Sequence, residues 1–277
     1  MLQIKLRNQS IWRIHFQQVD SSETAQLQSE TLSSSALLER LDLKRVRNLT
    51  RILYTSAIAH TLTLSSQTSP AIVADQLAND LTQRLQQSAF AFDLPIPPEA
   101  QSTLRIQSTP NGLIQVELSD WSIALWLGAV LSASDPCPSP LILPTALAPE
   151  RVFAAQYAHA RCCSLLCLAH AECLGQTQAE PIAWLNSSKD LPLTLSARHL
   201  VCELFSSWEF LLQPRSGSPD KLLFSLIQRF QAFHSTTQMF DQPERGRVEV
   251  NCGLLLATQR VLHWWLTLLH LPAPVQL

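Results

Sequence analysis

The sequence predicts a mainly α-helical protein, with a small α+β domain near its N-terminus and a helical bundle at its C-terminal end. Apolar residues recur at helical spacing in four segments after residue 148, which is typical of amphipathic helices. Apolar and polar residues alternate in short runs before residue 119, which is typical of strands. A proline-rich segment separates the two parts, with prolines at 136, 138, 140, 144 and 149.

Composition limits the class of protein. A chain of 277 residues is long enough for two domains, and 46% hydrophobic with 15% charged residues is typical of a globular protein. The net charge of -2 does not favour a general nucleic-acid binder, so RNA binding would depend on local basic patches. We expect no signal peptide, because charge follows the first apolar residues at once, and the longest apolar run, Trp121 to Ala133, is too short to span a bilayer. We therefore expect a cytoplasmic protein with no membrane partner.

The first domain is predicted to cover residues 1–132. Residues 2–17 alternate like a β-hairpin, and residues 18–34 are a polar connector. Residues 35–60 are predicted to form a helix, one face of which would carry a basic stripe. That stripe contains Arg40, Lys44, Arg47 and Arg51, with Arg45 beside it. It could follow a phosphate backbone, although a charged helix face is usually only solvated.

The rest of this domain is predicted to contain two helices and two strands. Ser69-Pro70 is an N-cap followed by a proline at the first helical position. Strands are expected near 104–106 and 114–118, joined by a turn at Pro110-Asn111-Gly112. Ser119-Asp120 should begin a short apolar helix that ends near Ser132. Residues 133–148 are then a linker.

Four helices are predicted in the second domain, residues 149–277. They are expected at about 149–174, from 196 to before Pro214, from Ser218 onward, and at about 248–271. Four amphipathic helices can bury one common core as a bundle.

The start of this second domain resembles a known family. Residues 153–166 read FAAQYAHARCCSLL. This run is similar to the first long helix of the anticodon-binding domain of arginyl-tRNA synthetases, in which Gln-Tyr-Ala-His-Ala-Arg is followed, after one residue, by Cys-Ser. The resemblance implies a helical bundle of the DALR anticodon-binding type.

Other segments resemble the same family. SPAIVADQLA at 69–78 and PNGLIQVELSDW at 110–121 are similar to parts of its N-terminal domain. FQAFH at 230–234 resembles its Phe-Asn-Ala-Phe-Tyr, and 255–262 with 268–274 resemble its closing helix and tail. The resemblance covers most of 65–132 and all of 150–277, whereas residues 1–34 match no family pattern and the literal Asp-Ala-Leu-Arg is missing.

The motifs of the family's catalytic domain are absent from the sequence. No His is followed two residues later by Gly, and no Lys-Met-Ser-Lys-like run or glycine-rich phosphate loop occurs. We therefore expect no ATP-dependent arginine–tRNA ligase activity from this chain alone, no catalytic residues and no cofactor.

The candidate RNA-binding residues come from the resemblance. It implies that the helix carrying Gln156, Tyr157 and Arg161 faces an anticodon loop, where Tyr stacks on a base and Arg binds phosphate or a base edge. The alternative is that Tyr157 packs on a neighbouring helix and Arg161 forms an ordinary ion pair. Arg245 and Arg247 would add a smaller basic spot before the last helix.

Histidines and cysteines of the same helix could suggest a metal site. His159, Cys163, Cys167 and His170 share one side, but side chains strung along about 16 Å of helix cannot converge on one ion. We expect packing roles and no metal. Cys202 and Cys252 lie in apolar helices, which disfavours a reactive thiolate. Trp264 and Trp265 point about 100° apart, so one should be core and the other is free for an interface.

These observations together predict a non-catalytic tRNA-binding protein, with arginine tRNA as the expected ligand and no DNA binding. A tRNA-acting enzyme or synthetase could be a further partner. One alternative is a protein-interaction scaffold that has lost RNA binding. Another is an accessory subunit that completes an arginine–tRNA ligase with a separate catalytic chain.

Overall fold

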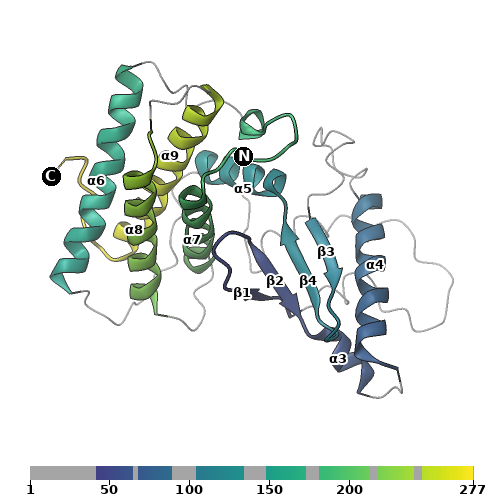
Figure 1. Ribbon diagram of the computed structural model, residues 1–277. Coiled ribbons are helices and arrows are strands. Elements are labelled where there is room, and N and C mark those ends of the chain that lie inside the picture. Colours follow the sequence, from purple (N-terminus) through teal and green to yellow (C-terminus); the bar gives the residue numbers. More distant parts are fainter. Residues whose placement is uncertain are drawn as a thin grey trace, which may run out of the picture. The chain divides into compact units, whose positions relative to one another are not determined.

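The computed structural model describes residues 42–64, 68–88, 104–133, 148–172, 181–212, 218–239 and 245–276 (Figure 1). In these ranges the chain is mostly helical, as the sequence predicted, and it has a four-stranded antiparallel sheet near the N-terminus. Contacts divide the chain into two compact units. The first contains residues 1–48 and 52–119, and the second contains residues 49–51 and 120–277. The expected hairpin at 2–17, its connector and most of the proline-rich linker lie outside the described residues.

The first unit is built on an antiparallel sheet with the strand order β1-β2-β4-β3. Strand β4 is central, and its buried residues alternate with half-buried ones, so one face of the sheet is apolar. Helices α3 and α4 belong to the same unit, and α4 packs along β3. The elements are β1 (Lys44–Val46), β2 (Leu53–Ser56), α3 (Ile58–Thr63), α4 (Pro70–Ser88), β3 (Leu104–Ser108) and β4 (Ile114–Leu118).

The turn between β3 and β4 packs closely against the start of α4. Gly112 has a φ of +73°, and its N–H donates to the carbonyl of Thr109 at 2.9 Å. A Cβ at Gly112 would lie 2.7 Å from the Cβ of Pro70, the first residue of α4. The turn therefore needs glycine for its conformation and for the close approach. The predicted helix start, turn and strands are confirmed here.

The predicted helix over residues 35–60 is wrong. The described part of this range forms β1, β2 and the start of α3. Ile52, Tyr54 and Ser56 are buried while Leu53 and Thr55 are half-buried, which is the period of a strand. A short apolar run fits the period of a helix as well as that of a strand. The pairing of β2 with β4 on one side and β1 on the other selects the strand.

The second unit contains a bundle of the long helices α6, α7, α8 and α9 (Figure 1). Helix α9 packs against α6 and α7, and α7 packs against α8. A short helix, α5, and a 3-10 turn, η2, lie against α9. The elements are α5 (Asp120–Ser132), α6 (Pro149–Ala171), η2 (Pro181–Trp184), α7 (Leu195–Leu212), α8 (Pro219–Thr236) and α9 (Arg245–Leu268).

Helix α5 groups with the second unit by its contacts, whereas the predicted domain boundary lies after residue 132. Its buried residues include Trp121, Trp126 and Leu127, and its partners are α9 and η2. This helix is apolar on nearly every side, so its sequence pattern does not reveal which element covers it.

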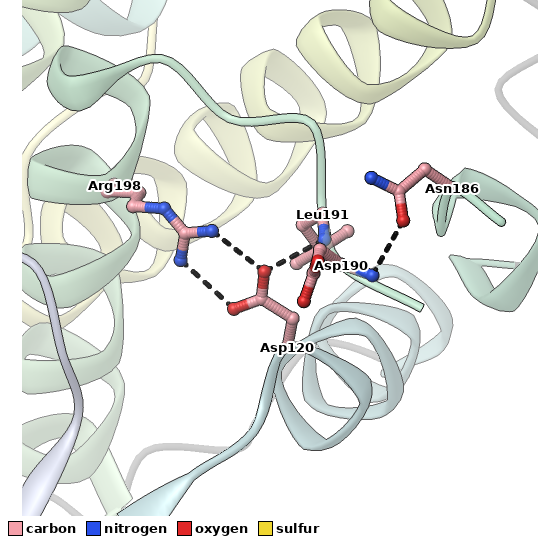
Figure 2. Close-up of polar contacts among 5 residues, drawn as sticks. All are labelled: Asp120, Asn186, Asp190, Leu191 and Arg198. Atoms are coloured by element: carbon pink, nitrogen blue, oxygen red, sulfur yellow. Dashed lines mark hydrogen bonds and ion pairs between the residues drawn. The ribbon is translucent and has the colours of Figure 1, made fainter. Parts of the chain in front are cut away.

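A polar cluster fixes the start of α5 (Figure 2). The Asp120 carboxylate accepts hydrogen bonds from the Arg198 guanidinium of α7 and from the backbone N–H of Leu191 at 2.8 Å. The loop that carries Leu191 is itself closed by the side chain of Asn186, which accepts from the N–H of Asp190 at 2.9 Å. Asp120 therefore ties α5 to α7 and to the loop before it.

Tryptophans fill the centre of the bundle. Trp264 and Trp265 are both buried, so the expectation that one of them is free for an interface is wrong. Trp264 contacts the ring of Trp208 at a centroid distance of 4.8 Å, and Trp265 stacks on Phe210 at 5.3 Å. The two rings can both be buried because α9 has helices on more than one side.

Candidate nucleic-acid interface

An exposed strip runs along α6. It contains Phe153, Tyr157, Arg161, Ser164 and Leu168, spaced three or four residues apart, so that they share one helix face. The three large apolar members are 61% (Phe153), 48% (Tyr157) and 47% (Leu168) exposed. We call these five residues the α6 strip.

Two aromatic rings form the N-terminal part of the α6 strip. Phe153 and Tyr157 are one turn apart and stack with a centroid distance of 6.2 Å and an interplanar angle of 24°. Adjacent rings four residues apart on a helix support each other. They present flat apolar surface to solvent on which an unpaired base can stack.

Arg161 continues the strip one turn further along α6. Its Nη2 donates to Nε2 of His234 on α8 at 3.4 Å. A guanidinium has only donors, so the imidazole accepts and is neutral in this arrangement. Burial, and then the charge of Arg161, lower the pKa of His234 below its usual value.

A second contact joins α6 to α8 nearer to their N-termini. Arg151 forms an ion pair with Asp220, and its guanidinium lies 5.2 Å from the centroid of Phe224. Because a carboxylate neutralises Arg151, this arginine is a weaker anion site than Arg161. The contact holds α8 along one side of the strip.

The C-terminal tail lies along the other side of the strip. Helix α9 ends in a Schellman-type turn, in which His270 has a φ of +55° and the N–H of Leu271 donates to the carbonyl of Leu266 at 2.8 Å. The tail is then held on α6 by two side chains. Gln156 Nε2 donates to the carbonyl of Pro272 at 3.0 Å, and His159 Nδ1 bonds the carbonyl of Pro274 at 2.9 Å.

His159 is buried at the centre of this tail contact. Its Nε2 lies 2.9 Å from Nε2 of Gln259 on α9, and an amide nitrogen is a donor, so the ring is neutral with its proton on Nδ1. Burial lowers the pKa of His159, and the nearby ring of His263 acts in the same direction, while the bond to Pro274 opposes it. Cys163 lies one turn away with its Sγ 3.9 Å from Nδ1, and burial raises the pKa of that thiol. These contacts agree with a packing role for His159 and Cys163.

The structure brings the three predicted residues of α6 to one region. Tyr157 and Arg161 are exposed and available to a ligand. Gln156 is half-buried, and its amide nitrogen is engaged with Pro272, so it positions the tail. Arg245 is the first residue of α9, and Arg247 is half-buried on that helix.

The basic stripe expected at the N-terminal end does not form on a helix. Arg40 lies outside the described residues, and Lys44 and Arg45 are consecutive in β1, so they point to opposite faces of the sheet. Lys44 is exposed and pairs with Asp42 at 3.3 Å. Arg47 and Arg51 are exposed in the segment between β1 and β2. Lys44 and Arg45 therefore do not share the single helix face that the prediction required.

The residues of the candidate interface that the sequence did not identify include Phe153 and His234. Phe153 lies four residues before Tyr157, so helical spacing alone could have placed it on the same face. His234 stands where the resembled family has Tyr, but only the contact between α6 and α8 shows that it meets Arg161.

No family model matches the chain, and no curated protein or solved structure matches it either. The resemblance to arginyl-tRNA synthetases therefore depends on the residues quoted above. Among the described residues, no group of three His, Cys, Asp or Glu side chains could hold a metal ion. In the same residues, α6 is the one helix long and apolar enough to cross a membrane, a test that the core helix of a bundle also meets.

Proposed function

We propose that this chain is a non-catalytic tRNA-binding protein that holds unpaired bases against the α6 strip. The expected ligand is arginine tRNA, because the segment from Gln156 to Arg161 resembles the helix that faces the anticodon in arginyl-tRNA synthetases. In this proposal the second unit is a bundle of the DALR anticodon-binding type. The chain would bind tRNA alone or present it to a tRNA-acting enzyme.

One observation carries the proposal. Two stacked aromatic rings and a guanidinium follow one another along a single exposed helix face. Proteins that bind single-stranded RNA combine aromatic rings, which stack on bases, with cations, which bind the phosphates between those bases. Phe153 and Tyr157 supply the rings, and Arg161 supplies the charge.

The same arrangement supports recognition of loops over recognition of duplexes. The net charge of -2 gives no strong general attraction to nucleic acid, so a few local contacts must select the ligand. Stacking requires unpaired bases, which loops provide and regular helices do not. We therefore expect the chain to bind duplex RNA and duplex DNA more weakly than an RNA loop.

The direct test is binding of a fluorescently labelled anticodon stem-loop of arginine tRNA, followed by anisotropy at 50 mM salt. Tyr157→Leu should weaken binding by about 5-fold to 150-fold, because stacking on one base contributes about 1–3 kcal/mol. The leucine keeps apolar area at the same position and removes only the aromatic plane. Equal binding by wild type and Tyr157→Leu would contradict base stacking at this position.

A protein-interaction scaffold is the second candidate. Phe153 and Leu168, the two ends of the α6 strip, are the features that favour it, because an exposed apolar helix face also suits a partner helix. The Tyr157→Leu variant separates the two functions, since a protein partner should tolerate leucine. Arginine-dependent ATP–pyrophosphate exchange by the purified chain would contradict the non-catalytic part of the proposal.

A further inference from the structure

The partner of Arg161 is not a carboxylate. Lys44, Arg105, Arg151 and Arg198 each pair with a carboxylate. Arg161 instead donates to a neutral imidazole, that of His234. The pair therefore keeps the full positive charge of the guanidinium at an exposed position next to Tyr157.

We propose that Arg161 and His234 form one phosphate-binding site, and that the site takes up a proton when an RNA phosphate binds. This inference rests on the proposed RNA-binding function and names the second cation of the same interface. The ligand is a phosphodiester of the strand whose bases stack on Phe153 and Tyr157. The proton comes from solvent, and no covalent bond is made or broken.

The geometry explains why the proton should accompany the phosphate. Without ligand, Nε2 of His234 accepts from Arg161, so the proton of the neutral ring is on Nδ1. A phosphate at this position offers only acceptors, which would face the lone pair of Nε2. Protonation turns that nitrogen into a donor, and both side chains then donate to the same anion.

The surroundings of His234 disfavour its charged form in the absence of an anion. The charged group facing it is Arg161 from α6, and on its own helix the ring of Phe230 lies 6.2 Å away. Partial burial and the arginine charge both lower the pKa of His234. A bound phosphate reverses the charge that His234 experiences, so its pKa should rise in the complex.

The test measures the dissociation constant of the labelled anticodon stem-loop from pH 7.5 to pH 5.5 at fixed salt. Binding that carries a proton tightens as the pH falls from the pKa of His234 in the complex toward its pKa in the free protein. We expect the dissociation constant to fall by about threefold to tenfold over this range, because one pKa unit of difference corresponds to a factor of ten.

The matched variants isolate the pair. His234→Gln keeps a polar side chain but cannot gain a charge, so the pH dependence should flatten to the slope that other titrating groups contribute. His170→Gln, at an exposed position elsewhere on α6, should retain the wild-type slope. Arg161→Gln should weaken binding at every pH. Arg229→Gln should not, because Arg229 and His234 lie on different sides of α8.

The outcomes separate this inference from the proposed function. RNA binding whose pH dependence is unchanged in His234→Gln overturns proton uptake at this site and leaves the RNA-binding function standing. An NMR titration in which the pKa of His234 does not rise when the stem-loop is added would also overturn proton uptake and leave the RNA-binding function standing. Absence of any RNA binding by the wild type, at low salt and at every pH, overturns both.

Discussion

Arg198 holds both carboxylate oxygens of Asp120, with Nη1 3.0 Å from Oδ1 and Nη2 2.8 Å from Oδ2. The two donors of a guanidinium match the two oxygens of a carboxylate, so the pair fixes orientation as well as distance. The hydrogen bond to Asp120 is the first cause that raises the pKa of Arg198. The pair links the first residue of α5 to α7, across a sequence separation of 78 residues.

The first prediction concerns this pair. Asp120→Ala should lower the free energy of unfolding by about 2–3 kcal/mol, because the half-buried guanidinium of Arg198 and the N–H of Leu191 lose their acceptor. Urea unfolding followed by tryptophan fluorescence would measure the change. Asp190→Ala is the control, since its carboxylate lies in the same loop and is exposed (Figure 2). A loss for Asp190→Ala as large as for Asp120→Ala would contradict the role of the pair.

The second prediction concerns Gly253 on α9. A Cβ there would overlap the ring of Trp184, which is buried in η2, with Cζ2 at 2.6 Å. Gly253→Ala should therefore destabilise the second unit by about 1–3 kcal/mol, although alanine is the better helix former. Gly246→Ala on the same helix meets no atom within 4 Å and should be neutral or stabilising by up to about 1 kcal/mol. Thermal unfolding should show a lower Tm for Gly253→Ala and an unchanged or higher Tm for Gly246→Ala.

The third prediction concerns the turn that ends α9. His270 is in the left-handed region with a φ of +55°, where a side chain costs about 1 kcal/mol relative to glycine. His270→Gly should therefore stabilise the protein by about that amount. Thr267→Gly, at an exposed position inside α9, should destabilise the protein. This control shows whether glycine stabilises the protein only at the left-handed position. Chemical denaturation of the two variants provides the measurement.

The fourth prediction is a pH dependence of stability that arises from His159. Its folded-state pKa is lowered, so below pH 6.5 the unfolded chain binds more protons than the folded chain does. This stability is present above pH 6.5 and is lost as the pH falls toward the folded-state pKa of His159.

Unfolding of the wild type and of His159→Asn at pH 7.5 and pH 5.5 tests this prediction. Asparagine keeps a donor that can bond Pro274 and does not titrate. The variant should therefore lose part of the pH dependence, while His234, whose pKa is also lowered, supplies the rest. His170→Gln should behave like the wild type. An unchanged pH dependence in His159→Asn would show that the tail contact is not the titrating element.

Local patterns were sufficient for the elements that carry strong signals. Prolines after Ser69 and Ser218 marked the starts of α4 and α8, and Gly112 marked the turn before β4. The segment 42–56 was misread because its few apolar residues fit either period. Its strand character comes from pairing with β4, whose partner residues lie about 60 positions away.

The candidate interface also combines features that local patterns reveal with contacts that only the tertiary structure shows. Helical periodicity alone places Tyr157 and Arg161 on one face of α6. It does not show that Gln156 holds the tail at Pro272, since that contact spans 116 residues. Nor does it show that His234 of α8 meets Arg161.

The sequence by itself determined the four long helices of the second unit, strands β3 and β4, and the shared helix face of Tyr157 and Arg161, because periodicity, caps and turns are properties of neighbouring residues. Tertiary structure decided that α5 joins the bundle, that both Trp264 and Trp265 are buried, and that the tail and α8 flank the strip. These features depend on which apolar surfaces meet and which buried polar groups find partners. Such contacts join distant residues, so no local pattern encodes them.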